Sequence, residues 1–459
     1  MTRTRRHYFR RNNEPVQTIM TKKTFVLAAS ALLILAVLVG GCSALGGLIP
    51  FRGKEDILPG ERRAALPQGA YEIAGGTPAI GGATALAEWP QPGGNAANAP
   101  GNVSLGGTSA ASTWRVNAVQ KASKRNVRPS VPPIVSGGRI FVYDTSGRVT
   151  ALAPGGGKAW SISLAPEGEK SRAAGGGIAA SGSAVFAATG FGEVVALDAA
   201  TGARVWTFEM SAPAHSAPTA AEGKVFVVSA TNVLHAVNQA DGTEAWQFLG
   251  IPETAGVLSA ASPAVSGNTV VVPYSSGEVI AFEADSGELK WADAVVRSTR
   301  TLAVSGLTDV AASPVIYEGV VYATGVSGRT IAVRLNDGDR LWEENIGSAS
   351  TPAISGNAIF IVDLRDNLVA LDRSTGTVFW RTALPTVRKK RFFSVWAGPT
   401  LAGGVLWAVS NDRKMVGVDP ATGNIIVDRD LPSPAYVKPI AAGGQLVLLS
   451  ADGSLTAFR

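Results

Sequence analysis

Cysteine and histidine are scarce in this chain of 459 residues, which contains one cysteine and three histidines. One cysteine cannot form an internal disulfide, and no group of cysteines and histidines has the spacing of a metal site. A Ser–His–Asp triad would need His215, which precedes a predicted strand, or His235, whose strand position is apolar in four other repeats. We therefore expect no catalytic residues, no metal and no cofactor, and predict that the protein is not an enzyme.

Charged residues are also few, at 17% of the chain, and the formal net charge of +6 is concentrated at the N-terminus. Residues 1–41 contain seven Lys or Arg and one Glu, which accounts for the whole of this charge. Residues 42–459 therefore carry no net charge and offer no basic footprint for nucleic acid. We expect partners other than nucleic acid.

Long apolar runs are absent as well. The main run, Phe25–Val39, has 15 residues, whereas a helix needs about 20 to cross a bilayer. Two lysines precede this run and small residues follow it, a pattern typical of a secretory signal peptide, which we assign to residues 1–41. Met20 is an alternative start for this signal.

The only cysteine of the chain follows the apolar run, in the sequence Val39-Gly40-Gly41-Cys42. This sequence resembles the lipobox of bacterial lipoproteins, in which the cysteine thiol is acylated and the chain is cut before it. The resemblance implies that Cys42 is a lipidation site. Ser43, where some lipoproteins have Asp, favours the periplasmic face of the outer membrane. An ordinary secretory signal with an incidental cysteine is the alternative.

Residues 42–110 are rich in Gly, Ala, Pro and Asn and have few adjacent large apolar side chains. Such a segment cannot bury much apolar surface by itself. We predict that it is a flexible tether between the lipid anchor and the body of the protein. Trp89 is an exception within it, and we expect this side chain to dock onto the body.

A short repeated unit fills most of the remaining chain, and one clear copy is Val194–Trp206, VVALDAATGARVW. In each copy a strand-like apolar stretch leads into a polar turn that ends in Gly, and Trp follows four residues later. The copies end at Trp160, Trp206, Trp246, Trp291, Trp342 and Trp380, which are 38 to 51 residues apart. This period is typical of propeller blades, each of which is a four-stranded antiparallel sheet.

A second repeated element predicts the number of blades. A small residue and Pro, followed by apolar positions and a Gly turn, mark the start of each blade, and one copy lacks the Pro. The starts lie at Pro133, Ile178, Pro218, Pro263, Pro314, Pro352, Pro399 and Pro439. Eight starts predict an all-β, eight-bladed β-propeller over residues 111–459, and seven blades is the alternative.

The last repeat ends at Arg459, one strand short of a blade, with Ala457 in the place of Ala196. We expect residues 112–116, which include Trp114, to supply the missing strand and to close the ring. The repeat tryptophans should pack between blades, with each indole N–H free to reach a neighbouring carbonyl. The turn aspartates should cap their own backbone; they are Asp198, Asp285, Asp337 and Asp372.

Two basic stretches lie in long connections that interrupt the repeat. Residues 388–393 read RKKRFF, and residues 297–300 read RSTR. A charge run is usually a solvated surface, but basic and aromatic residues on a rigid rim also suit docking to an acidic protein surface or lipid headgroups. We therefore name Arg300, Arg388 and Arg391 as candidate partner-binding residues.

The unit A-L-D-x-x-T-G-x-x-x-W, complete at Ala370–Trp380, resembles the propellers of pyrroloquinoline quinone (PQQ) enzymes and their non-enzymatic relatives. Together with the lipobox and eight blades, it resembles the BamB family, lipoproteins of the machine that assembles outer-membrane β-barrels. The resemblance implies a non-catalytic scaffold that binds BamA and other BAM subunits and assists unfolded outer-membrane proteins. It also implies partner contacts near Leu258 and Asp309, the latter matching an acidic residue of the family.

Two alternatives stay open at this point. A quinoprotein dehydrogenase would share the repeat, but most of these enzymes carry a vicinal cysteine pair and calcium beside the quinone. Cys42, as the only cysteine, excludes the pair. The second alternative is a lipoprotein propeller that binds peptidoglycan or another component of the envelope.

Overall fold

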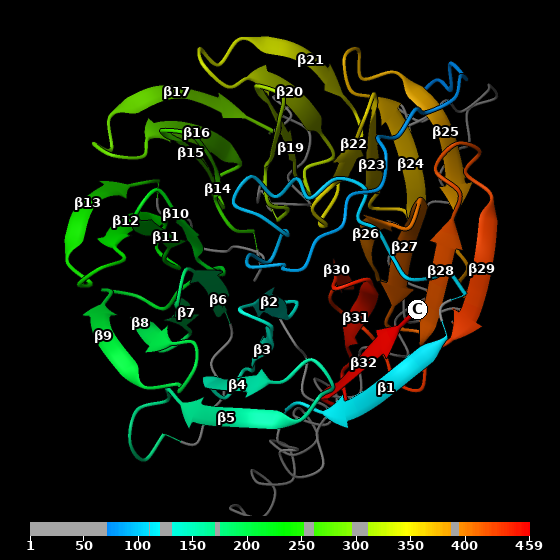
Figure 1. The fold of residues 1–459 in the computed structure, drawn as a ribbon. Helices are drawn as coiled ribbons and strands as arrows, with labels where there is room; N and C mark the ends of the chain where they lie inside the picture. Colours follow the sequence, from blue (N-terminus) through cyan, green and yellow to red (C-terminus); the bar gives the residue numbers. More distant parts are fainter. Residues whose placement is uncertain are drawn as a thin grey trace, which may run out of the picture. The chain divides into compact units, whose positions relative to one another are not determined.

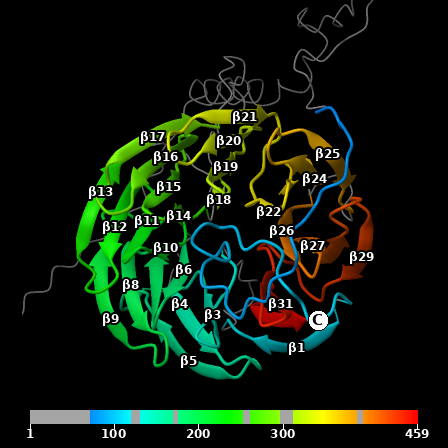
Figure 2. The same ribbon diagram turned by 45° about the horizontal axis from the view of Figure 1, so that its top comes forward.

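Eight four-stranded antiparallel sheets follow one another around a ring, which is an eight-bladed β-propeller (Figures 1 and 2). The computed structural model describes residues 71–109, 111–119, 131–169, 175–251, 261–295, 311–386 and 394–459. All of them belong to one unit, Gly69–Arg459. In this described part of the chain, no helix is long and apolar enough to cross a membrane. The predicted all-β class and the number of blades are confirmed.

The first four blades take their strands in chain order, from the innermost to the outermost. Blade 1 is β2 (Ile134–Ser136), β3 (Arg139–Tyr143), β4 (Arg148–Leu152) and β5 (Lys158–Ser163). Blade 2 is β6 (Gly176–Ser181), β7 (Ala184–Thr189), β8 (Glu193–Asp198) and β9 (Arg204–Glu209). Blade 3 is β10 (Thr219–Ala221), β11 (Lys224–Val228), β12 (Val233–Asn238) and β13 (Glu244–Leu249). Blade 4 is β14 (Ala264–Ser266), β15 (Thr269–Pro273), β16 (Glu278–Glu283) and β17 (Leu289–Ala294).

The other four blades have the same order, except that the last takes its outer strand from near the N-terminus. Blade 5 is β18 (Val315–Tyr317), β19 (Val320–Thr324), β20 (Thr330–Arg334) and β21 (Arg340–Glu344). Blade 6 is β22 (Ala353–Ser355), β23 (Ala358–Val362), β24 (Asn367–Asp372) and β25 (Val378–Ala383). Blade 7 is β26 (Trp396–Ala402), β27 (Val405–Ser410), β28 (Lys414–Val418) and β29 (Ile425–Asp430). Blade 8 is β30 (Ile440–Ala442), β31 (Gln445–Leu449), β32 (Ser454–Phe458) and β1 (Ser112–Asn117).

The burial of each strand follows its place in the blade. Middle strands such as β11 are buried along almost their whole length, because both faces of a blade pack against neighbouring blades. They are accordingly continuous apolar runs rather than alternating ones. Outer strands such as β9 alternate between exposed and half-buried residues, since they lie at the rim of the ring.

The ring closes in blade 8, where β1 pairs antiparallel with β32. Trp114 lies opposite Ala457 in this pairing, as Trp206 lies opposite Ala196 in blade 2. The N-terminal strand therefore takes the register of an ordinary outer strand. This confirms the predicted closure and the correspondence of Ala457 with Ala196.

The repeat tryptophans join six successive pairs of blades, from blade 1 to blade 7. The indole N–H of Trp206 donates to the backbone oxygen of Gln239 in blade 3, at 2.9 Å. Five other joints repeat this bond between an indole Nε1 and a carbonyl oxygen of the following blade: Trp160–Ala199, Trp246–Ala284, Trp291–Leu335, Trp342–Arg373 and Trp380–Pro420. The predicted packing of these side chains between blades is confirmed.

Each of these indoles lies against the glycine of the next blade's repeat turn. A Cβ added to Gly242, whose φ is +77°, would come within 2.7 Å of the Trp206 ring. The position thus requires glycine twice, for its left-handed backbone and for the space that the indole fills. The glycine that ends each repeat turn is therefore the packing site for the tryptophan of the preceding blade.

Residues 71–109 belong to the same unit as the ring, so the predicted tether does not extend to residue 110. Trp89 is 1% exposed, and its backbone forms a two-way hydrogen-bonded bridge with Val135 of β2. Trp89 therefore docks as expected. Hydrogen bonds from backbone and side-chain amide groups hold the rest of the segment against the ring. Amino-acid composition does not predict such bonds.

The joint between blades predicts an unequal response to two glycine substitutions. Gly267→Ala places alanine at φ +52° with nothing within 4 Å of its Cβ, and should cost about 1 kcal/mol. Gly242→Ala adds a clash with Trp206, and should cost about 2 kcal/mol more. Denaturant unfolding of the two variants measures the difference. Equal losses of stability would contradict the proposed fit between indole and glycine.

Candidate partner-binding face

The two faces of the ring carry different loops. Each innermost strand begins on one face and each outermost strand ends on it, so this face carries the connections between blades. We call it the connection face; it also bears the turns between second and third strands, such as residues 363–366. The opposite face, here the turn face, bears the glycine turns between first and second strands and the repeat turns that receive the tryptophans.

The residues named from sequence as partner-binding sit in three connections of the connection face. These connections are residues 250–263, between β13 and β14, residues 295–314, between β17 and β18, and residues 384–395, between β25 and β26. The named residues themselves, Leu258, Arg300, Asp309, Arg388 and Arg391, lie outside the described residues, as does Cys42. What the structure describes is the stem of each connection.

Exposed apolar side chains lie at two of these stems. Leu249 and Ile251 are 72% and 55% exposed where blade 3 ends, and Val395 is 54% exposed where blade 7 begins. Leu364, in the turn of blade 6 on the same face, is 49% exposed. Large apolar groups left in water at the entry and exit of connections suit a protein-docking surface.

Sequence reasoning missed Leu249, although a signal for it exists. Aligning the last residues of the outer strands places Glu209, Glu344 and Asp430 at the equivalent position, opposite the first residue of the third strand. Leu249 has the same register, opposite Val233. The position is acidic in these three blades and is Ser, Ala or Asn in the other four, so a large apolar residue there would have marked the end of blade 3.

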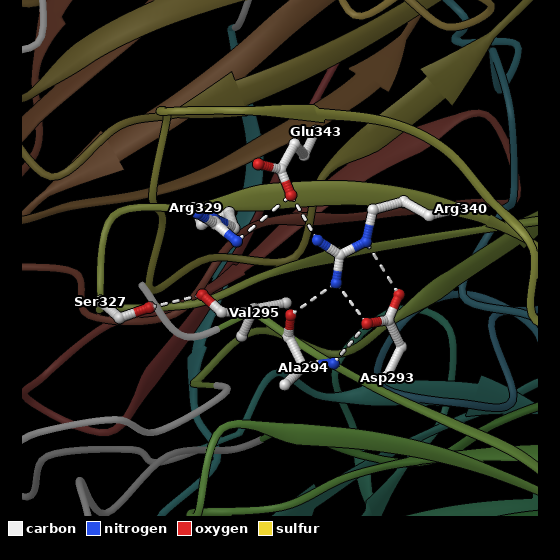
Figure 3. A network of polar contacts seen from close by, with 7 residues as sticks. All are labelled: Asp293, Ala294, Val295, Ser327, Arg329, Arg340 and Glu343. Carbon is white, nitrogen blue, oxygen red and sulfur yellow. Dashed lines mark hydrogen bonds and ion pairs between the residues drawn. The ribbon is translucent and has the colours of Figure 1, made fainter. Parts of the chain in front are cut away.

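A network of charges fixes the stem of the connection 295–314 (Figure 3). Arg340 of β21 forms a two-pronged ion pair with Asp293 of β17 and donates to the backbone oxygen of Ala294, at 3.1 Å. Its other nitrogen pairs with Glu343, which also accepts from Arg329 at 3.2 Å. The hydrogen bonds from Arg340 to Asp293 raise the pKa of this guanidinium above its ordinary value.

The next residue of the stem is held by backbone groups. Val295 N donates to the backbone oxygen of Gly277 at 2.9 Å, and the Ser327 hydroxyl donates to the oxygen of Val295 at 2.7 Å (Figure 3). Blade 5 thus holds the chain as it leaves blade 4.

A groove with a volume of about 510 Å³ lies between blades 6 and 7 on the connection face. Leu364, Asp366, Val395 and Trp396 are among its lining residues. Burial raises the pKa of Asp366 to about 6, and the carboxylates of Asp363 and Asp412 add to this effect. The groove therefore combines apolar walls with an acid that resists ionisation.

The remaining residues considered from sequence have structural surroundings. Asp198 accepts hydrogen bonds from the backbone and hydroxyl of Thr201, which lower the pKa of this carboxyl. Asp337 and Asp372 cap their turns in the same way, whereas Asp285 forms an ion pair with Lys224, at 2.8 Å. The capping prediction thus holds for Asp198, Asp337 and Asp372, whereas the carboxylate of Asp285 bonds to blade 3.

Neither of the two histidines of the ring is hydrogen-bonded to a serine or threonine hydroxyl in the part of the chain that the structure describes. His235 is 4% exposed in β12, with Nδ1 at 2.7 Å from the Glu244 carboxylate and its ring edge against Phe208. Burial lowers the pKa of His215. Within the described ranges, no group of three His, Cys, Asp or Glu side chains could hold a metal ion.

The charge network predicts a selective loss of stability. Arg340→Ala leaves Asp293, 17% exposed in its side chain, without its cation and should cost about 2 kcal/mol. Arg334→Ala, which removes exposed pairs with Asp337 and Asp339, is the matched control and should change stability far less. Denaturant unfolding of both variants checks this, and an equal effect would contradict the assigned role of Arg340.

Asp366 predicts a pH-dependent difference. Its pKa of about 6, against an ordinary 3.8, means that its contribution to stability is present below pH 4 and is lost as the pH rises through 6. Asp366→Asn, which tolerates the same φ of +59°, should therefore be more stable than the parent by about 1 kcal/mol at pH 7.5, since partial exposure reduces the effect. At pH 4 the two should unfold alike. Denaturant unfolding of both proteins at both pH values tests this. The same difference in unfolding free energy at pH 4 and pH 7.5 would refute it.

Comparison with known proteins places this ring in a family. The family model described as outer membrane protein assembly factor BamB matches residues 145–382 and 383–459. The BamB of Yersinia pestis is 26% identical over 333 residues, which cover 71% of this chain and 83% of that protein.

Solved structures share the architecture. The crystal structure of BamB from Moraxella catarrhalis matches with a TM-score of 0.62 and 18% identity, over 76% of this chain and 99% of that one. A europium-containing methanol dehydrogenase matches with a TM-score of 0.66 and 13% identity, over 81% of this chain and 98% of that one. Identities this low show a common fold alone. The family model, by contrast, covers more than half of the chain, and the chain therefore belongs to the BamB family of outer membrane protein assembly factors.

Proposed function

We propose that the protein is a non-catalytic scaffold of the complex that assembles outer-membrane β-barrels. Cys42 carries its lipid anchor, which holds the ring at the periplasmic face of the outer membrane. The connection face binds BamA, together with other BAM subunits, and the scaffold assists the insertion of unfolded outer-membrane proteins. Membership of the BamB family supports this proposal.

The observation that carries the docking site is that exposed apolar side chains and a fixed charged stem lie at the connections of one face. Leu249 and Ile251 flank the connection that holds Leu258, and the Arg340–Asp293 pair fixes the stem of the connection that holds Arg300 and Asp309. A rigid ring that presents irregular loops is a common arrangement for binding. Arg388 and Arg391 extend the proposed surface to the connection between blades 6 and 7.

The non-catalytic assignment rests on the residues available. A vicinal cysteine pair cannot form with one cysteine, and that cysteine is the proposed lipid site. Purified protein supplied with PQQ and Ca²⁺ should therefore oxidise neither alcohols nor sugars. Turnover under these conditions would replace the scaffold by a quinoprotein dehydrogenase.

The docking proposal predicts a face-specific effect on BamA binding. Leu249→Glu places a charge on the connection face and should weaken the complex with the purified periplasmic part of BamA about 10-fold or more. Leu289→Glu is the matched control, because Leu289 is 55% exposed but begins β17 at the turn face. Titration calorimetry measures both affinities. The proposal fails if the parent protein forms no complex, and the choice of face fails if Leu289→Glu is the weaker binder.

A further inference from the structure

Residues 79–106, which we call the channel segment, cross the centre of the ring on its turn face (Figures 1 and 2). The innermost strand of every blade is a sheet edge, since each pairs with one neighbour in its own sheet. Its second side therefore presents N–H and C=O groups toward the centre, as edge strands do. The channel segment is the part of the chain that meets these groups.

Backbone bonds tie the channel segment to seven blades. In blade 1, Trp89 and Val135 exchange two hydrogen bonds, at 2.8 and 2.9 Å. The other donor–acceptor pairs are Ala180 N–Pro90 O (2.8 Å), Val265 N–Ala96 O (2.7 Å), Ile316 N–Ala97 O (2.9 Å), Asn357 N–Ala79 O (3.0 Å), Gly403 N–Val103 O (2.7 Å) and Gly443 N–Leu86 O (2.8 Å). These bonds reach the innermost strands of blades 2, 4 and 5 and the turns that follow the innermost strands of blades 6, 7 and 8, which leaves blade 3.

The side chain of Gln91 supplies the bonds to blade 3. Its amide nitrogen donates to the backbone oxygen of Ala220 at 2.9 Å, and its amide oxygen accepts from the Ala220 N–H at 3.3 Å. The amide thus offers the donor and acceptor that a peptide group would offer to a sheet edge. Gln91 is 3% exposed, so these bonds form out of contact with water.

Two further side chains anchor the segment. Asn98, 2% exposed, donates to the backbone oxygen of Pro314 at 2.9 Å, and so holds blade 5 at its first strand. Trp89 joins the apolar cluster that includes Val135 and Ile440, from blades 1 and 8. Recognition therefore combines one buried indole, two buried amides and a set of backbone bonds.

The segment leaves little empty space between itself and the ring. A cavity between it and blades 6 to 8, lined in part by Trp89, Asn98 and Lys438, has a volume of about 10 Å³, about the space of one water. From residue 89 to residue 106 the segment carries no charged side chain. Glu88 is its one charged residue, and its carboxylate accepts from the Gly137 N–H at 2.9 Å. The segment is rich in Gly, Ala, Pro and Asn and makes backbone-bonded turns at residues 91–94 and 95–98.

We propose that the inner edges of the ring form a peptide-binding site, and that the channel segment is its ligand, bound within the same molecule. The site takes a peptide that carries a tryptophan preceded by a glutamate, correctly spaced amide side chains in turns, and no other charged residue. Its occupation closes the centre of the ring on the turn face. A partner that binds the connection face therefore binds a ring whose central opening on the turn face is filled by the channel segment. This proposal does not depend on the identity of those partners.

Cleavage of the folded full-length protein tests the proposal. A recognition sequence for a site-specific protease, inserted between Gly107 and Thr108, allows the segment to be cut from the ring after folding. The N-terminal fragment should stay with the ring during size-exclusion chromatography at micromolar concentration. Excess synthetic peptide of residues 79–106 should displace it, while the circular dichroism of the ring stays unchanged.

Substitutions show which contacts hold the fragment. Gln91→Ala and Asn98→Ala should each speed its dissociation about 10-fold, because each leaves buried backbone groups without a partner. Asn95→Ala is the matched control, since this exposed amide bonds to Ala99 of the segment itself, and dissociation should not change. Immediate loss of the parent fragment, or equal rates for all three variants, would overturn the proposed recognition. Unfolding of the ring on displacement would overturn the assignment of the segment as a ligand.

Discussion

The joint between neighbouring blades is the contact on which the ring depends. A tryptophan of one outer strand lies on the glycine of the next blade's turn and donates its N–H to a carbonyl beside that turn. The indole buries apolar area and satisfies a backbone oxygen at the same time. Because the tryptophan and the glycine it packs on belong to the same repeat, each of the first six blades presents the site for its successor. The angle between blades is thereby set six times by one local arrangement.

The edge strands of the sheets in this ring still have backbone N–H and C=O groups that need hydrogen-bond partners. The outer edges lie at the rim, where alternating exposed residues keep them in water. The seam is closed by β1, which reproduces the ordinary register of an outer strand on β32. The inner edges are met by the channel segment, through backbone groups and the amide of Gln91. Water, β1 and the channel segment therefore satisfy three different kinds of edge: the outer edges, the seam and the inner edges.

The proposed division of labour between the faces follows from strand direction. Glycine turns and tryptophan receptors occupy the turn face, where substitution is constrained by packing. The connections between blades leave from the other face, where lengths vary and where Leu249, Ile251 and Val395 are exposed. The Arg340 network ties blade 5 to Asp293 and Ala294 at the end of β17, where the connection between blades 4 and 5 begins.

The sequence by itself determined the class of fold, the eight blades, the closing strand and the role of the tryptophans. These features are local and periodic, so turn glycines and the spacing of Trp160 to Trp380 predict them directly. The path of residues 71–109 was decided by the tertiary structure, and the predicted boundary at residue 110 was wrong for that reason. A segment of Gly, Ala, Pro and Asn has no periodic apolar face, and its partners are backbone groups that come together only when the ring has formed. The exposed position of Leu249 likewise depends on register and not on composition, since the same residue inside a blade would be core.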